Sequence, residues 1–174
     1  AEQGFKAVTF DYRGIGGSQP KAGLRGFKAK MRDWAALDLT TAVDYVEHLA
    51  NGKPLLYVGH SFGGQALGQL PNNHKVGRAL FAASQIGYWR LFPAPEKYRV
   101  WFSLRVLGPL AYSIFGYVPG KMGMGEDLPK GVFKEWAGWS MNPRYLYDDQ
   151  TLDARKHFPN YKGALRAVGM SDDD

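Results

Sequence analysis

The sequence contains no cysteine. Disulfide bonds, thiolate nucleophiles and cysteine-based metal sites are therefore excluded, and the redox state of the compartment stays open. We also find no internal repeat, no phosphate-binding loop and no spacing of metal ligands, so we expect neither a metal nor a cofactor. The glycines at positions 14, 16 and 17 are not a dinucleotide-binding fingerprint, because the third is wrongly spaced and no clear helix begins there.

Long apolar runs are missing as well. The longest uncharged stretch, residues 106–120, is about 15 residues long, whereas a membrane-spanning helix needs about 20. It also contains Pro109 and Pro119, so we expect no membrane span. No targeting segment is recognisable, and because the true N-terminus is not seen, a cytoplasmic location is only the default expectation.

The sequence also lacks clusters of positively charged residues. Lys and Arg outnumber Asp and Glu by 22 to 16, which gives a formal net charge of +6. The basic residues are nevertheless scattered, and no run of them exceeds interrupted pairs. This pattern argues against a nucleic-acid partner.

What is present is the composition of a globular domain. Hydrophobic residues make up 45% and charged residues 22% of 174 residues, which is enough for one substantial core. The chain starts at Ala1 close to a strand pattern and stops at three aspartates directly after another. Both ends look cut through a fold, so we expect an internal piece of a longer protein.

The most informative stretch is residues 55–64, Leu-Leu-Tyr-Val-Gly-His-Ser-Phe-Gly-Gly. An apolar run stops at Gly-x-Ser-x-Gly and continues as a helix pattern. A serine on such a sharp turn presents its hydroxyl above a sheet, provided that Gly59 and Gly63 leave room for the backbone. Gly64 loosens the turn further. We predict that Ser61 is a nucleophile; the alternative is a serine that caps the helix expected over residues 62–70.

Strand and helix patterns alternate along the first half of the chain. Residues 5–10, 55–58 and 78–83 read as strands, and a glycine-rich loop at 11–18 follows the first. A helix is predicted over residues 31–50, with Asp33 as its N-cap and Asn51-Gly52 as its stop. Its expected shared face is Trp34, Leu37, Thr41, Tyr45 and Leu49.

This alternation predicts the α/β class: a mostly parallel sheet covered by helices on both faces. Residues 88–161 differ, since they hold most of the aromatic residues and seven prolines. We interpret them as a helical cap inserted into a core formed by residues 1–87 and 162–174. The strand expected at residues 165–170 returns the chain to the sheet.

These motifs resemble the α/β-hydrolase fold superfamily. Asp11-Tyr-Arg-Gly-Ile-Gly-Gly-Ser18 is similar to the Asp-x-Arg-Gly-x-Gly-x-Ser loop after the fourth strand of that fold, and Gly59-His60-Ser61-Phe62-Gly63 resembles its nucleophile elbow. Residues 87–90, 125–129 and 143–149 look like a poorly characterised subgroup of predicted hydrolases. The resemblance covers essentially the whole chain.

The resemblance implies a triad in the order serine, acid, histidine. Ser61 matches the nucleophile, and Asp172 or Asp173 matches the acid; the two are not distinguished. The histidine would follow later, and the four present at positions 48, 60, 74 and 157 all precede the acid. The backbone N–H of Phe62 is one oxyanion donor by position, and the other would lie upstream of Ala1. We therefore expect the 174 residues alone to be inactive.

The implied activity is that of a serine hydrolase that acts on carboxylic esters or similar acyl compounds through an acyl-enzyme on Ser61. The aromatic cap predicts an apolar small-molecule substrate, although its aromatics could equally form the cap's own core. An acyltransferase on the same scaffold and a non-catalytic binding protein are the alternatives. Asp11 and Arg13 are expected to hold their loop in place rather than to act in a site.

Overall fold

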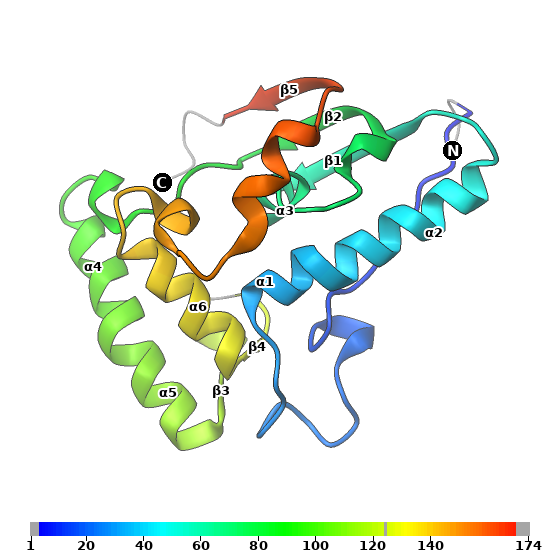
Figure 1. Cartoon of the computed structure of the whole chain (residues 1–174). Helices are drawn as coiled ribbons and strands as arrows, with labels where there is room; N and C mark the ends of the chain where they lie inside the picture. Colours follow the sequence, from blue (N-terminus) through cyan, green and yellow to red (C-terminus); the bar gives the residue numbers. More distant parts are fainter. Residues whose placement is uncertain (1–3, 124, 170–174) are drawn as a thin grey trace.

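The computed structural model describes residues 4–123 and 125–169, and its main sheet has three parallel strands (Figure 1). β1, Leu55–His60, and β5, Ala164–Val168, flank β2, Val76–Ala82. Val58 lies opposite Leu80, which lies opposite Arg166. Because the strands are parallel, their carboxyl ends share one edge. The prediction of an α/β fold with a parallel sheet flanked by helices is confirmed.

Six α-helices accompany the sheet in the part of the chain that the structure describes. They are α1 Met31–Asp33, α2 Thr40–Ala50, α3 Phe62–Leu67, α4 Glu96–Phe102, α5 Gly108–Phe115 and α6 Lys130–Ser140. π-helical turns at Trp34–Leu39 and Ser103–Leu107 join α1 to α2 and α4 to α5. β3, Tyr117–Val118, pairs antiparallel with β4, Leu128–Pro129. Short 3₁₀ turns are Gly16–Ser18, Asn73–Lys75, Trp89–Leu91, Gly120–Met122, Tyr145–Asp148, Asp153–Lys156 and Phe158–Asn160.

The helix predicted over residues 31–50 is present and Trp34 is buried as predicted, but most of the expected buried face was predicted wrongly. Leu37, Tyr45 and Leu49 are exposed to solvent. The π-helical turn has more residues per turn than an α-helix, which favours residues four apart on one side. The buried face is formed by Met31, Ala35, Leu39 and Val43.

The two ends of this helix also differ in how well they were predicted. Asp33 is not the N-cap; Lys30 takes that position, and the Asp33 carboxylate accepts a hydrogen bond from the Lys30 backbone N–H at 2.8 Å. The stop was predicted correctly. Asn51 ends α2 in the left-handed conformation with a φ of 47°, and Gly52 follows with a φ of 82°.

Residues 5–10 do not form the predicted strand. A strand exists only where its backbone pairs with a neighbour, and none of the described strands pairs with this segment. The side chains of Phe5, Val8 and Phe10 are 62%, 42% and 40% exposed. Residues with high strand propensity are therefore not sufficient here.

Helices cover one face of the sheet among the described residues, not both as predicted. Along β1, Leu55 and Gly59 are buried on the side of α3, whereas Leu56 and Val58 point the other way and are 53% and 70% exposed. Leu80, opposite Val58, is exposed on that second face as well. The sheet therefore presents a bare apolar surface.

The helical segment 88–161 packs onto the rest of the molecule through one continuous core. The main buried cluster joins α3 and the sheet to α6 and to the loop after it. A smaller cluster lies between α5 and α6, where a Cβ added to Gly108 would stand 2.0 Å from the Phe133 ring. The main cluster includes Leu67, Leu70, Val76, Trp139, Tyr145, Leu146 and Leu152. A separate cap domain stays a prediction.

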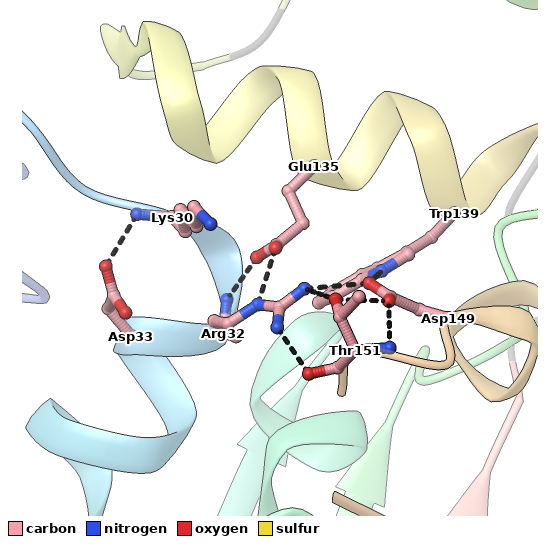
Figure 2. A network of polar contacts seen from close by, with 7 residues as sticks. All are labelled: Lys30, Arg32, Asp33, Glu135, Trp139, Asp149 and Thr151. Carbon is pink, nitrogen blue, oxygen red and sulfur yellow. Dashed lines mark hydrogen bonds and ion pairs between the residues drawn. The ribbon is translucent and has the colours of Figure 1, made fainter. Parts of the chain in front are cut away.

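Arg32 links α1 to α6 and to the loop beyond it (Figure 2). Its Nε and backbone N–H donate to the Glu135 carboxylate at 2.6 and 2.7 Å, and its Nη2 donates to Asp149 at 2.8 Å. Burial raises the pKa of the Asp149 carboxyl, but hydrogen bonds from Thr151 and Trp139 outweigh it, so the pKa lies below its ordinary value. The Asp149 carboxylate therefore stays ionised beside the Arg32 guanidinium at neutral pH.

Replacing Arg32 by Met is expected to lower the free energy of unfolding by about 2–3 kcal/mol, because two carboxylates in a partly buried site lose their cation. Their side chains are only 9% and 18% exposed. Arg144→Met is the matched control, since the ion pair of Arg144 with Asp148 is on the surface and is expected to contribute below about 1 kcal/mol. Urea unfolding at neutral pH measures both. Equal losses in the two variants would show that the Arg32 network adds nothing.

Candidate active site

Ser61 lies on the sharp turn between β1 and α3, at the carboxyl edge of the sheet. Its φ of 49° and ψ of −120° put a non-glycine residue outside the regions that side chains normally allow. Such strain costs about 1–3 kcal/mol and persists only where the surroundings impose it. The residue as a whole is exposed to solvent.

Three hydrogen bonds hold the strained peptide units of Ser61. Its backbone N–H donates to the Ala82 carbonyl at 3.0 Å. Its carbonyl accepts from the Ser84 hydroxyl at 2.8 Å and from the Gly64 N–H at 3.1 Å. At about 1 kcal/mol each, these bonds are large enough to offset the strain. Ser84 follows β2, so the neighbouring strand fixes the turn.

The glycines of the turn have unequal roles. A Cβ on Gly59 would stand 2.5 Å from the Gly64 nitrogen, and a Cβ on Gly64 would stand 2.2 Å from the Ser84 hydroxyl. At Gly63 the nearest atom is the Tyr57 hydroxyl, at an ordinary 3.7 Å. The sequence motif gave Gly63 the same importance as Gly59. The structure instead places the close backbone approach at Gly59 and Gly64.

Phe62, the first residue of α3, is held by an aromatic cluster. Its ring meets Tyr12 at 6.3 Å and Trp34 at 6.2 Å, both edge-on, and Tyr12 stacks on Trp34 at 4.8 Å. Burial, with a smaller effect of Asp38, raises the pKa of Tyr12 to about 12, so the phenol stays neutral. The N–H of Phe62 starts a helix and has no acceptor one turn earlier.

The loop after residue 10 is held by its charged side chains, as predicted for Asp11 and Arg13. The Asp11 carboxylate accepts from the Gly17 N–H at 2.8 Å, and a Cβ on Gly16 would stand 2.6 Å from that carboxylate. Arg13 pairs with Asp38 of the π-helical turn Trp34–Leu39 at 2.7 Å. These contacts fix the loop that carries Tyr12, and through it Phe62.

A cavity of about 250 Å³ lies beside the turn. One of its walls is Ser84, which hydrogen bonds to Ser61. Another is Tyr145, which is 2% exposed and strained, with a φ of 55°. Burial raises the pKa of Tyr145, so its phenol is neutral at physiological pH. The remaining lining residues are Gly64, Gln65, Phe81, Gln85, Ile86, Leu146, Tyr147 and Phe158.

Sequence reasoning missed the supporting roles of Tyr57, Ser84 and Tyr145. The Tyr57 hydroxyl donates to the Gly63 carbonyl at 2.6 Å, and burial raises its pKa. Alternation along β1 could have indicated that this side chain points inward. Ser84 stands directly after a strand, which is a usable signal. Nothing in the sequence indicates the left-handed backbone of Tyr145.

The two acid candidates, Asp172 and Asp173, lie outside the described residues. β5 ends at Val168, whose carbonyl accepts from the Ala83 N–H at 3.0 Å. The chain therefore leaves the sheet at the same edge as Ser61, two strands away. Two strand spacings are about 10 Å.

None of the four histidines is hydrogen bonded to Ser61 in the part of the chain that the structure describes. His60 is adjacent in sequence but exposed at the end of β1, and His48 and His74 are exposed as well. His157 contributes its backbone carbonyl to the Asn73 amide at 2.9 Å. Within residues 4–123 and 125–169, the Ser61 hydroxyl donates no hydrogen bond to a histidine.

Comparison with known families agrees with this geometry. Residues 1–124 match the family model described as Serine aminopeptidase, S33. The chain belongs to this family, which lies within the α/β-hydrolase superfamily. The matched residues of this S33 family member include the elbow at 59–63 and the loop at 11–18. Membership supports hydrolase chemistry in general. No curated protein and no solved structure matches the chain.

This family member shows neither a metal-binding cluster nor a membrane-spanning helix among its described residues. Across residues 4–123 and 125–169, His, Asp and Glu side chains nowhere gather in threes that could hold a metal ion. In the same ranges, every helix is too short or too polar to cross a bilayer.

Proposed function

We propose that the protein is a serine hydrolase that acts on carboxylic esters or similar acyl compounds, with Ser61 as nucleophile. The observation that carries the proposal is the strained, exposed serine at the carboxyl edge of a parallel sheet, held by three hydrogen bonds at the start of a helix. Strain of this kind is concentrated at functional sites. Family membership supports the hydrolase class.

In the proposed reaction, the Ser61 hydroxyl oxygen attacks the substrate carbonyl carbon while its proton passes to a histidine. The Phe62 N–H donates to the resulting oxyanion. The carbonyl re-forms as the leaving alcohol departs with the proton, which leaves an ester on Ser61. Water then hydrolyses this ester and regenerates the hydroxyl.

The remaining roles belong to residues outside the described ranges. Asp172 or Asp173 is proposed to orient the histidine, because both follow β5 in the sequence and β5 ends at the edge that carries Ser61. The histidine and the second oxyanion donor are assigned to polypeptide beyond these 174 residues, as the order of the superfamily implies. Under this assignment, activity depends on a histidine that the 174 residues do not supply.

The cavity beside Ser61 supports a small substrate with an apolar part. Its volume of about 250 Å³ suits a short acyl or alcohol group rather than a long chain. Phe81, Ile86 and Leu146 supply apolar walls. Gln65 and Ser84 add polar groups close to the turn.

A fluorophosphonate probe tests the proposal. We expect it to label the complete gene product at Ser61, as mapped by mass spectrometry, because only an activated serine reacts rapidly. The 174-residue chain is expected to show neither labelling nor ester turnover, since it lacks the proton acceptor. Rapid hydrolysis by the 174-residue chain, or labelling of another serine, would contradict the assignment. Transfer of the acyl group to an added alcohol would indicate an acyltransferase. A complete gene product with neither labelling nor turnover would indicate a binding role.

A further inference from the structure

A second cavity, of about 660 Å³, shares no lining residue with the one beside Ser61. It lies between residues 26–33, the first turns of α6 and Gly116 at the end of α5. Figure 1 shows α1 and α6 close to each other in this region. Nothing in the proposed hydrolase chemistry uses this cavity.

Cationic side chains dominate its rim. Lys28, Lys30, Lys130 and Lys134 all line it, and none of them makes an ion pair within residues 4–123 and 125–169. The one carboxylate of the lining, Asp33, already accepts the Lys30 backbone N–H. The lysines outnumber this carboxylate, and a cleft with an excess of positive charge concentrates anions.

The start of α6 adds to this positive potential. α6 is 11 residues long and begins after Pro129, which makes no side-chain capping bond. The first N–H groups of a helix have no intrahelical acceptor, and the helix dipole is positive at that end. Lys130 and Gly131, the first two residues, both line the cavity.

The walls of the cavity are fixed before any ligand arrives. Arg25 donates to the carbonyls of Ile114 and Phe115 at 2.7 and 3.2 Å and thereby joins residues 25–30 to the end of α5. A Cβ on Gly131 would stand 2.2 Å from the Ala29 carbonyl oxygen, so α6 and this loop are in direct backbone contact. Such preorganisation lowers the entropic cost of binding.

The lining between the lysines is apolar. Ala29 belongs to the main core cluster, the half-buried Phe27 packs against that cluster, and both residues line this cavity. Its volume lies within the range of small-molecule sites. A ligand that satisfies both parts needs an anionic head and an apolar body.

We propose that this cavity binds a single-chain anionic amphiphile, with a phosphate or carboxylate head held by the lysines and the start of α6, and its chain against Phe27 and Ala29. The site is independent of Ser61. It therefore stands whether or not the proposed hydrolase activity is found.

Calorimetric titration with decyl phosphate below its micellar concentration tests the site. We expect one molecule bound per chain, with weaker binding of inorganic phosphate and of neutral decyl maltoside, because each supplies only half of the recognition. The double variant Lys28→Gln with Lys134→Gln is expected to bind about tenfold more weakly, since two charge-assisted contacts are lost. Added salt should weaken binding to the unsubstituted chain.

The matched control is Lys6→Gln with Lys53→Gln, which removes the same charge at exposed positions outside the cavity. It is expected to retain the affinity for decyl phosphate. Equal weakening in both double variants would overturn the site, as would equal affinity for the maltoside. Binding only to vesicles of anionic lipid, without one-to-one binding of the monomer, would also overturn it and would indicate a membrane-facing surface instead.

Discussion

Replacing Ser61 by Ala in the complete gene product is expected to reduce ester hydrolysis by at least about a thousandfold, because the acyl-enzyme can no longer form. A p-nitrophenyl ester of a short acid measures the rate directly. Ser113→Ala is the matched control, since Ser113 is also exposed and its hydroxyl only bonds to the Pro109 carbonyl. That variant is expected to keep its full rate.

The Ser61 variant is expected to stay folded. Among the described residues, the three hydrogen bonds that fix the turn use the backbone of Ser61 and not its hydroxyl. Thermal unfolding should therefore change little. A Ser61→Ala protein that hydrolyses the ester at the original rate would refute the nucleophile assignment.

Gly59→Ala is expected to lower the free energy of unfolding by more than about 3 kcal/mol. The added methyl would lie 2.5 Å from the Gly64 nitrogen and 2.7 Å from the Gly63 carbonyl carbon, and neither backbone atom can move without shifting α3. Urea unfolding measures the loss. The same variant should lose fluorophosphonate labelling in the complete gene product, because Ser61 is displaced.

Gly63→Ala is the informative control for this prediction. Its methyl would meet only the Tyr57 hydroxyl at 3.7 Å, and alanine is the better helix former, so we expect a change within about 1 kcal/mol. Similar large losses at both positions would mean that the whole Gly-x-Ser-x-Gly motif needs small residues. Similar small losses would mean that the close approach at Gly59 is easily relieved.

The sequence was most informative where a local pattern is compatible with only one backbone conformation. An apolar run that stops at Gly-x-Ser-x-Gly and continues as a helix predicted β1, α3 and the turn at Ser61. Alternation with a helix then predicted the parallel pairing of β1 with β2. In these places the local backbone preference and the tertiary fold agree.

Predictions failed where a partner or a small irregularity decides the outcome. Residues 5–10 have the composition of a strand, but pairing is a property of two segments, and one segment cannot reveal it. The face of α2 was misjudged because the π-helical turn before it changes which residues align. The importance of Gly64 depends on Ser84, which is 20 positions later and meets it only in the folded chain.

The face of the sheet that no described helix covers affects the solubility of the protein. A solvent-exposed apolar strip crosses two adjacent strands and consists of Leu56, Val58 and Leu80. Exposed strips of this kind promote self-association, which the net charge of +6 opposes through mutual repulsion. Concentrated stocks should therefore precipitate first in alkaline or high-salt buffers, where that repulsion is weakest.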